Sequence, residues 1–359
     1  MQSPESIMRD ITAFWQSGQM HGESILPIRS QTDVNTTVKL AFVPGDLPRL
    51  VKCDLTQTYE PGKDFTWEPG SNEINIPADS RIIVVRESDL YRPAHSQRHG
   101  KCRDQDRDIF FAPKGQYRDM QTAVSYAFDV KQWKLAMRMQ PAGTLPNITA
   151  KLTAGDPVNL VFMGDSITTG CDVSGKYNVA PNAPGYAQLL TDAISQKFSC
   201  KVNAQNLAVG GKTSDWGLEQ TDNIIAQKPD LVVLAFGMND ASHQTTALKF
   251  QGNISQMIVD IKASCPTCEF MLVATMTANA EWEHASPELY PQYREVLSLL
   301  QGTGIIMADV YSLWDELVKR KGYLSFTANG LNHPNDFGHR LYAQTLWASL
   351  LHTVGVQSM

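Results

Sequence analysis

Four short segments of the chain bring together residue types that can carry out acyl transfer. Ser166 offers a hydroxyl, which becomes an effective nucleophile when an imidazole such as that of His333 takes its proton. The intermediate of such a reaction carries an oxyanion, which preorganised N–H groups stabilise. The backbone of Ser166, the backbone of Gly211 and the side-chain amide of Asn239 can supply those groups. The segments that hold these residues are 164–168, 210–214, 237–240 and 332–336.

Each segment taken alone also has a structural explanation. A serine after a strand often caps a helix, two glycines often form a tight turn, and an Asn-Asp pair is common in turns. The argument for chemistry therefore depends on where the elements around the segments place them.

The second half of the chain alternates between apolar runs and helical patterns. Short runs rich in Val, Ile and Leu predict buried parallel strands, and apolar residues at helical spacing predict helices over 247–263 and 337–351. The sequence thus predicts a flavodoxin-like, doubly wound α/β fold with a five-stranded parallel sheet, whose site lies outside the carboxyl ends of its strands. Three of the four segments follow the first three of these strands. The predicted strands are 158–163, 202–207, 231–236, 270–275 and 305–310.

The first half of the chain has a different pattern. After a short amphipathic helix, brief β-like runs alternate with Gly, Pro, Asn and Asp, which predicts a β-sandwich or jelly-roll domain. We expect this domain over residues 1–150 and the α/β domain over 151–359, with 141–157 as the linker. The β-like runs include 37–43, 49–53, 81–86 and 122–130.

The four segments resemble the sequence blocks of the SGNH, or GDSL, hydrolase superfamily. The resemblance covers about residues 158–351 and rests on four blocks in the family's order: Gly164-Asp165-Ser166-Ile167, Asn206 to Gly211, Gly237-Met238-Asn239-Asp240 and His333-Pro334-Asn335. It implies a serine esterase with Ser166 as nucleophile, His333 as general base and an oxyanion hole formed by Ser166, Gly211 and Asn239. It implies no metal and no cofactor.

One position departs from the family pattern. The family usually places an aspartate three residues before the catalytic histidine, and Gly330 stands there in this chain. A Ser–His dyad is the simplest expectation, with Asn329 or a backbone carbonyl accepting a hydrogen bond from Nδ1 of His333. Asp336 is the alternative third member, although it also fits the cap of the final helix.

The substrate is inferred from the layout of the chain. The β-rich first half resembles that of two-domain carbohydrate acetylesterases, and Trp216 and Trp282 lie in predicted loops where their rings could stack on sugars. The lack of an apolar acyl-binding stretch favours an acetyl group. We therefore expect an acetylated oligosaccharide or polysaccharide as substrate. The alternatives are a lysophospholipase or thioesterase of the same superfamily, and a non-catalytic carbohydrate-binding protein.

Charge and composition exclude other classes. The formal net charge is −6 and neither half is basic, so we expect no nucleic-acid partner. No apolar run is long enough to span a membrane. Cys265 and Cys268 have the spacing of a metal or redox pair but lack a second pair, which leaves a local disulfide or two free thiols. The N-terminus has no signal-peptide pattern, which fits either a cytoplasmic protein or a secreted one whose signal has been removed. The oligomeric state stays open.

Overall fold

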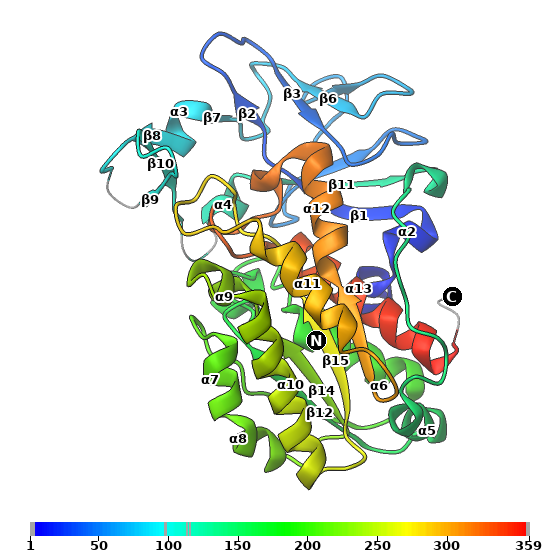
Figure 1. Cartoon of the computed structure of the whole chain (residues 1–359). Coiled ribbons are helices and arrows are strands. Elements are labelled where there is room, and N and C mark those ends of the chain that lie inside the picture. Colours follow the sequence, from blue (N-terminus) through cyan, green and yellow to red (C-terminus); the bar gives the residue numbers. More distant parts are fainter. Residues whose placement is uncertain (1–3, 97–98, 113, 115, 357–359) are drawn as a thin grey trace.

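The second half of the chain is built around a parallel sheet, which lies in the lower part of the molecule in Figure 1. The computed structural model describes residues 4–96, 99–112, 114 and 116–356. Five strands pair in parallel in the order β13-β12-β14-β15-β16, so the chain winds outward in both directions from β12. This is the predicted flavodoxin-like doubly wound sheet. The strands are β12 (Val158–Gly164), β13 (Val202–Asn206), β14 (Leu231–Ala235), β15 (Glu269–Ala274) and β16 (Ile305–Asp309).

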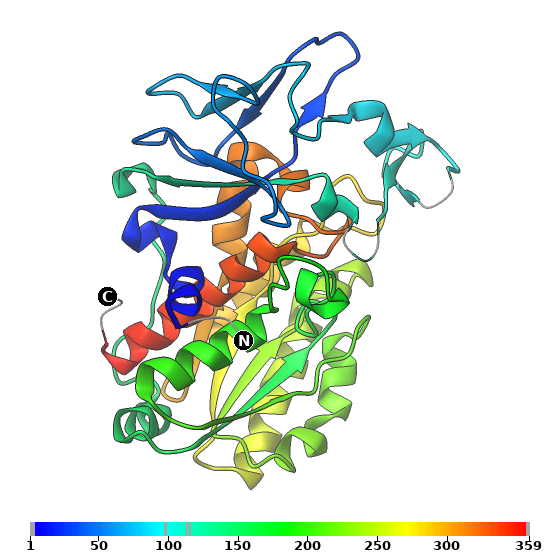
Figure 2. The ribbon, with the colours of Figure 1, turned by 180° about the vertical axis from the view of Figure 1, so that it is seen from behind.

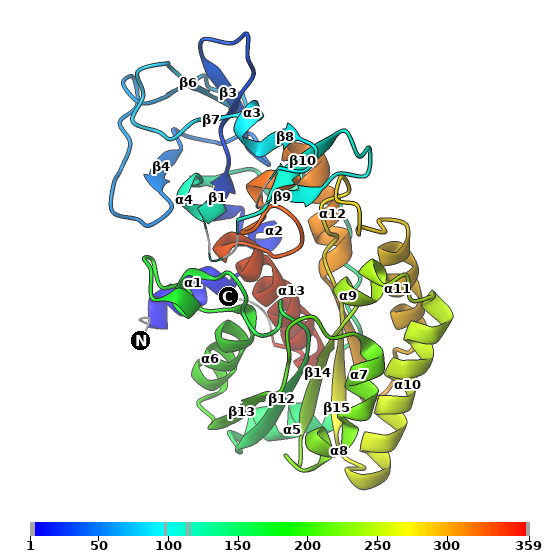
Figure 3. The same ribbon diagram turned by 90° about the vertical axis from the view of Figure 1, so that its left-hand side faces the viewer.

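Helices cover both faces of this sheet, as Figure 3 shows: α6 and α13 lie on one face, and α7, α10 and α11 lie on the other. The central strands β14 and β15 are wholly buried, which explains why β14 is apolar throughout and why β15 is apolar after Glu269. The helices of this half are α5 (Pro146–Ala154), α6 (Tyr186–Phe198), α7 (Ser214–Glu219), α8 (Thr221–Ile225), α9 (Met238–Ser242), α10 (Ala247–Ser264), α11 (Leu289–Leu299), α12 (Val310–Lys321) and α13 (Asp336–Val354).

Helix α13 is buried on nearly all sides, because the first residues of the chain cover its outer face. Helix α1 (Pro4–Ile11) packs on α6 and α13, and the first segment of the chain lies beside both in Figure 2. The side-chain amide of Gln344 donates to the backbone carbonyl of Asp10, and the guanidinium of Arg340 donates to the carbonyls of His21 and Gly22. The N-terminal helix thus contributes to the hydrophobic core of the α/β half.

The region between α1 and α5 is rich in β-structure, as predicted. Its strands are short and are divided among four small sheets, in the orders β1-β11-β4, β3-β6-β5, β8-β10-β9 and β2-β7. The strands are β1 (Gln19–Ile25), β2 (Ile28–Arg29), β3 (Thr36–Lys39), β4 (Arg49–Lys52), β5 (Thr66–Trp67), β6 (Glu73–Ile76), β7 (Val85–Arg86), β8 (Tyr91–Pro93), β9 (His99–Lys101), β10 (Arg107–Phe110) and β11 (Thr122–Ala127). Short helices lie in the same region: α2 (Phe14–Ser17) before β1, α3 (Glu87–Leu90) between β7 and β8, and α4 (Gln116–Asp119) between β10 and β11.

The β-rich region and the α/β half share one continuous hydrophobic core. Phe42 and Phe128 stack with ring centroids 4.1 Å apart, and the guanidinium of Arg320 on α12 lies 4.8 Å from the centre of the Phe42 ring. Lys321, at the end of α12, is fully buried in an ion pair with Glu23 on β1. Separating the two side chains would leave two uncompensated buried charges, which is unfavourable. This ion pair therefore holds the β-rich region against the α/β half.

A smaller contact joins the sheet β8-β10-β9 to a loop of the α/β half. Glu281 accepts hydrogen bonds from the hydroxyl of Tyr91, at 2.5 Å, and from the guanidinium of Arg107, at 2.8 Å. Cys102 forms an isolated β-bridge with Trp282. The β-rich region therefore extends to the loops that follow the sheet's strands.

Three further observations concern disulfide bonds, metal binding and membrane-spanning helices. All six cysteines are free thiols, Cys265 and Cys268 included. Within the described ranges, no three side chains of His, Cys, Asp or Glu gather in a group able to hold a metal ion. No helix among those same residues is long and apolar enough to cross a membrane.

Candidate active site

Ser166 stands on a tight turn at the carboxyl end of β12. A Cβ atom on Gly164 would lie 2.3 Å from the hydroxyl of Thr168 and 2.5 Å from the carbonyl oxygen of Ala235, so only glycine fits there. The carboxylate of Asp165 accepts a hydrogen bond from the N–H of Ile167 at 2.9 Å, which closes the turn around the serine. The serine hydroxyl is thereby held at the end of the strand.

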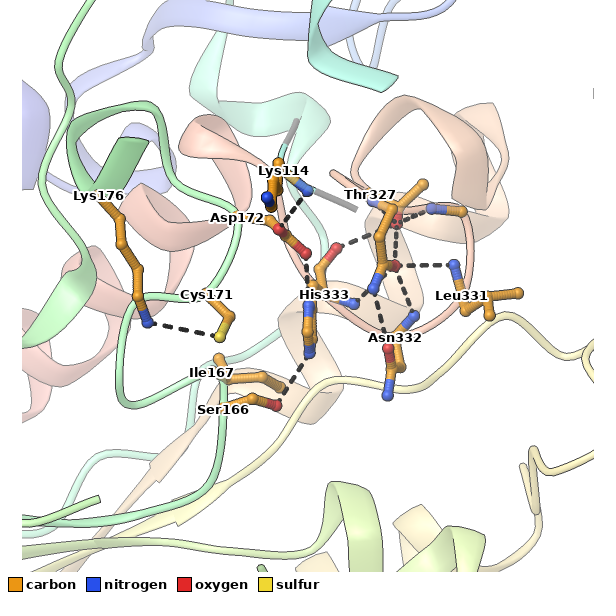
Figure 4. A network of polar contacts seen from close by, with 12 residues as sticks. Lys114, Ser166, Ile167, Cys171, Asp172, Lys176, Thr327, Leu331, Asn332 and His333 are labelled. Atoms are coloured by element: carbon orange, nitrogen blue, oxygen red, sulfur yellow. Dashed lines mark hydrogen bonds and ion pairs between the residues drawn. The ribbon is translucent and has the colours of Figure 1, made fainter. Parts of the chain in front are cut away.

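His333 connects Ser166 to a carboxylate. Its Nε2 lies 2.9 Å from Oγ of Ser166, and its Nδ1 lies 2.6 Å from Oδ2 of Asp172. Figure 4 shows the three side chains in one line, with the imidazole in the middle. A serine, a histidine and an aspartate in this arrangement are the components of nucleophilic acyl transfer.

Asp172 is fixed by contacts on its other oxygen. Oδ1 accepts hydrogen bonds from the backbone N–H of Lys114, at 2.9 Å, and from the hydroxyl of Tyr177, at 3.3 Å. Burial raises the pKa of this carboxyl, but the hydrogen bond and charge of His333 and the donors on Oδ1 outweigh it, and the pKa lies below its ordinary value. The carboxylate is therefore ionised at neutral pH. Lys114 belongs to the β-rich region, so both halves of the chain hold the acid.

The structure differs here from the expectation of a neutral partner for His333. Asn329 is buried next to residues 330–335, the loop that contains His333 and is called the histidine loop below. Its Oδ1 accepts from the backbone N–H groups of Leu331, Asn332 and His333 at 2.9, 3.0 and 3.1 Å. It orders the backbone of the loop and does not contact the imidazole.

Asp336 does not contact the imidazole either, and it is not the helix cap. Its Oδ1 accepts from the N–H of Ser174 at 2.8 Å. The N-cap of α13 is Asn335, whose side chain accepts from the N–H of Gly338. Asp172 occupies the position on Nδ1 that the sequence analysis assigned to Asn329 or Asp336.

Gly330 has a packing reason to lack a side chain. Its φ is +89°, and a Cβ atom there would lie 2.5 Å from the carbonyl oxygen of Phe110 and 2.8 Å from the ring of Tyr117. Both neighbours belong to the β-rich region, which thus fills the space beside the histidine loop.

One feature of the sequence could have indicated Asp172: it is the only carboxylate between Ser166 and the start of α6. Nothing in its spacing related it to His333.

The predicted oxyanion donors lie on adjoining loops beside Ser166. A Cβ atom on Gly210 would approach that of Ser166 to 3.6 Å, so the loop after β13 passes directly beside the serine. In the part of the chain that the structure describes, the backbone N–H groups of Ser166 and Gly211 donate to no other protein group. The side-chain amide of Asn239 donates to the carbonyl of Lys212 at 3.0 Å, which leaves its second hydrogen for another acceptor.

Asp240 ties these loops together. It accepts from the N–H and hydroxyl of Ser214 and from the N–H of Gly237, so the start of α7 and the start of α9 share one carboxylate. This link holds Asn239 beside the loop that contains Gly211. Two of the three predicted oxyanion donors, Gly211 and Asn239, therefore lie on loops that this carboxylate links.

The two tryptophans proposed as substrate contacts lie close to this region and are partly buried. Trp216 on α7 lies beneath Lys212, whose ammonium is 5.7 Å from the centre of its ring. Trp282 packs in a small cluster with Cys102 and with Leu331, which lies two residues before His333.

Another histidine, His339, is fully buried in α13, and burial lowers its pKa to about 3, so it does not compete with His333 as a base.

Comparisons with known proteins agree with the sequence blocks. The model of the GDSL-like lipase/acylhydrolase family matches residues 162–341. A search of curated proteins finds no significant match.

Several solved structures align with part of the chain. A two-domain esterase active on acetylated mannans, co-crystallized with mannopentaose, aligns at 22% identity and a TM-score of 0.47, over 59% of this chain and 54% of its own. An acetylxylan esterase from Geobacillus stearothermophilus aligns at 20% identity and a TM-score of 0.44, over 56% of this chain and 96% of its own. A lipase from a goat rumen metagenome aligns at 17% identity and a TM-score of 0.43, over 54% and 97%. The match thus spans about half the length of the acetylmannan esterase.

The family model begins within β12 and extends into α13, so it includes all four segments singled out in the sequence. It covers half of the chain, and the resemblance to SGNH hydrolases is confirmed. The chain belongs to the GDSL-like lipase/acylhydrolase family.

Proposed function

We propose that this protein is a serine ester hydrolase whose catalytic centre is Ser166, His333 and Asp172. The observation that carries the proposal is the unbroken line of contacts from Asp172 through both ring nitrogens of His333 to Oγ of Ser166, with distances of 2.6 and 2.9 Å. The carboxylate keeps the proton on Nδ1, so Nε2 is free to accept the proton of the serine hydroxyl.

The reaction has two steps. Oγ of Ser166 attacks the ester carbonyl while its proton passes to Nε2 of His333. The C–O bond to the alcohol then breaks, and the imidazolium returns the proton to the departing alkoxide. Water attacks the acyl-enzyme in the same manner and releases the acid together with the free serine.

The oxyanion of each tetrahedral intermediate lies, under this proposal, among the N–H groups of Ser166 and Gly211 and the amide of Asn239. These donors have fixed positions before the substrate binds, which is the condition for strong electrostatic stabilisation. Asp172 stabilises the imidazolium that forms in both steps. In known triads, loss of this acid function reduces turnover by about 10⁴.

The proposed substrate is a short acyl ester, most simply acetyl, of an oligosaccharide or polysaccharide. Two features support this choice: the positions of Trp216 next to Lys212 and of Trp282 next to Leu331, and the β-rich region that packs against Gly330. A long-chain ester or thioester is the alternative, and a non-catalytic sugar-binding protein is the alternative outside enzymes.

Replacement of the nucleophile tests the catalytic part. Ser166→Ala should reduce kcat on p-nitrophenyl acetate by at least ~10³, and a fluorophosphonate should label Ser166 in the unmodified protein, as peptide mass spectrometry would show. Ser264→Ala, an exposed serine at the end of α10, is the matched control and should keep full activity. Normal turnover by a folded Ser166→Ala variant would refute the assignment. Absence of turnover in the unmodified protein as well as in Ser166→Ala would favour the sugar-binding alternative.

A substrate panel tests the second part. Acetylated xylan, mannan and pectin and monosaccharide acetates should release acetate, and p-nitrophenyl esters should be hydrolysed more slowly as the acyl chain grows from two to eight carbons. A rate maximum at eight carbons would replace the carbohydrate proposal with the long-chain alternative.

A further inference from the structure

A cavity of about 350 Å³ lies where the start of α6 and strand β13 meet the turn that carries Ser166. Its wall includes Thr168 and Thr169 of that turn and Asn206 at the end of β13. Helix α6 packs on β13, as Figure 3 shows. Neither Ser166 nor its partner His333 lines the cavity, so it is a space beside the proposed catalytic centre and not the centre itself.

Among the residues that the structure describes, one cation and no carboxylate line this cavity. The cation is Lys176, which lies between Asp172 and α6 in the sequence. Its ammonium donates to Oγ1 of Thr169 at 3.0 Å and to the carbonyl oxygen of the same residue at 3.3 Å, which places the charge against a residue of the cavity wall. Figure 4 shows the ammonium beside Sγ of Cys171, 3.5 Å away. None of these partners is a carboxylate, so no ion pair within the described part of the chain satisfies the charge.

Two carboxylates close to the wall are engaged by other groups. Asp192 on α6 lies outside the lining and accepts from the amide of Gln188 at 2.7 Å. Asp172 faces His333, at 2.6 Å, and is likewise no part of the lining. An anion in the cavity therefore meets the ammonium of Lys176 without a carboxylate on the wall to oppose it.

The first turn of α6 adds to the preference for an anion. Helix α6 has 13 residues, and its N-cap, Gly185, offers no side chain to the first backbone N–H groups. The N–H of Ala187, a residue of the cavity wall, has no acceptor among the residues that the structure describes. The partial positive charge at the N-terminus of a helix attracts anions, and here it acts in the same direction as the charge of Lys176.

The remaining wall combines apolar carbon with amide groups. Phe162 on β12 and Ala204 on β13 contribute the apolar part. The amide of Asn206 uses one hydrogen for the carbonyl of Thr168 at 2.7 Å and keeps the other, and Oε1 of Gln188 has no donor in the part of the chain that the structure describes. A sugar ring offers hydroxyl groups to such amides and C–H groups to an aromatic ring. The volume lies within the range of small-molecule sites and admits one six-membered sugar ring.

We propose that this cavity binds a hexuronate, a sugar residue that carries a carboxylate. The carboxylate lies at the ammonium of Lys176 and the first turn of α6, and the hydroxyl groups face the amides of Gln188 and Asn206. The uronate comes either as a free sugar or as one residue of an acidic polysaccharide whose ester lies at Ser166. Binding does not depend on the proposed function, whereas an effect of the cavity on turnover rests on it.

Titration with galacturonate and with galactose, which lacks the carboxylate, tests the binding. The unmodified protein should bind galacturonate at least about fivefold more tightly, the effect of one partly exposed ion pair. Lys176→Met should bind the two sugars alike. Lys201→Met is the matched control, because this exposed lysine precedes β13 at the end of the strand opposite to Asn206, and it should keep the preference. Equal affinity for both sugars in the unmodified protein, or an unchanged preference in Lys176→Met, would overturn the proposal.

A crystal structure of the unmodified protein with galacturonate tests the location and does not depend on whether Lys176→Met folds. The sugar should occupy the cavity, with its carboxylate within hydrogen-bond distance of Nζ of Lys176. Galacturonate bound elsewhere, with this cavity empty at a concentration that saturates the titration, would overturn the proposal.

Turnover distinguishes the two sources of the uronate. The measurement is the ratio of kcat/KM for an acetylated oligogalacturonate to kcat/KM for an acetylated xylo-oligosaccharide, taken within each protein, so that a general change near Asp172 cancels. For a uronate within the substrate chain, Lys176→Met should lower this ratio about fivefold, and Lys201→Met should not change it. An unchanged ratio in Lys176→Met, with galacturonate still bound by the unmodified protein, would assign the cavity to the free sugar. Absence of all ester hydrolysis would refute the proposed function and leave the binding result standing.

Discussion

The proposed catalytic centre combines two regions that differ in how they are built. Ser166, Gly211 and Asn239 follow the ends of β12, β13 and β14, so the hydrogen-bond register of one parallel sheet brings them together. The histidine loop and Asp172 have no such frame. Their geometry depends on contacts with the β-rich region, which include the hydrogen bond from the N–H of Lys114 to Asp172.

The difference shows which parts of the site the sheet positions. Donors at strand ends take their places from the register of the parallel strands. An acid that only has to reach Nδ1 of His333 can come from any loop that passes there. In this chain the β-rich region packs against Gly330, and the carboxylate comes from the loop after Ser166 instead.

The largest expected effect concerns the acid. Asp172→Asn should reduce kcat on an acetate ester by about 10⁴, because an amide cannot stabilise the imidazolium and allows the wrong tautomer. Asp222→Asn on α8, an exposed carboxylate at the other end of the sheet, is the control and should be fully active. A loss below tenfold in Asp172→Asn, measured by steady-state kinetics on folded protein, would restore the Ser–His dyad.

A smaller effect is expected at the strand ends. Asn239→Ala should reduce kcat by about 10²–10³ with little change in KM, because the lost donor acts mainly on the transition state. Asn203→Ala, an exposed asparagine on β13, should change neither constant. Should Asn239→Ala affect only KM, the amide binds the substrate and is no part of the oxyanion hole.

The packing at Gly330 can be tested through stability. Gly330→Asp should lower the free energy of unfolding by about 2–4 kcal/mol, since it adds backbone strain at φ +89° to a clash with Phe110 and Tyr117. Gly70→Asp is a matched control, because Gly70 has φ +85° but open space around it, so it reports the strain alone. Urea unfolding of both variants gives the difference. If both lose the same stability, the β-rich region is not what excludes a side chain at Gly330.

The smallest expected effect concerns the pH dependence of stability and distinguishes His339 from His333. His333 is the proposed general base, whereas His339 is buried and its pKa is lowered from 6.5 to about 3. Between these values the unfolded chain binds a proton that the folded protein does not, so stability is retained above pH 6.5 and lost as the pH falls toward 3. His339→Gln should reduce the slope of unfolding free energy against pH by up to about 1.4 kcal/mol per unit in this window. Urea unfolding at pH 7.0, 5.5 and 4.5 measures it, and an unchanged slope would show that His339 is protonated alike in both states.

Local patterns in the sequence were sufficient for the sheet and its strand ends. The runs predicted at 158–163, 202–207, 231–236, 270–275 and 305–310 agree with the observed strands to within one or two residues. Strands β12, β14, β15 and β16 are mostly buried and largely apolar, so each could be recognised alone. Strand β13 lies at the edge of the sheet, and most of its residues are polar and exposed. The positions of Ser166, Gly211 and Asn239 then followed, because the carboxyl ends of parallel strands meet at one edge.

Only the tertiary structure decided the partner of His333 and the form of the β-rich region. Asp172 and His333 are 161 residues apart, and a carboxylate in a loop has no period or spacing that reveals which imidazole it will meet. The atoms that leave no room for a side chain at Gly330 belong to Phe110 and Tyr117, more than 200 residues away. Short strands likewise leave open which of them will pair. Such contacts depend on how separate segments fill a shared space, and the local sequence does not encode that packing.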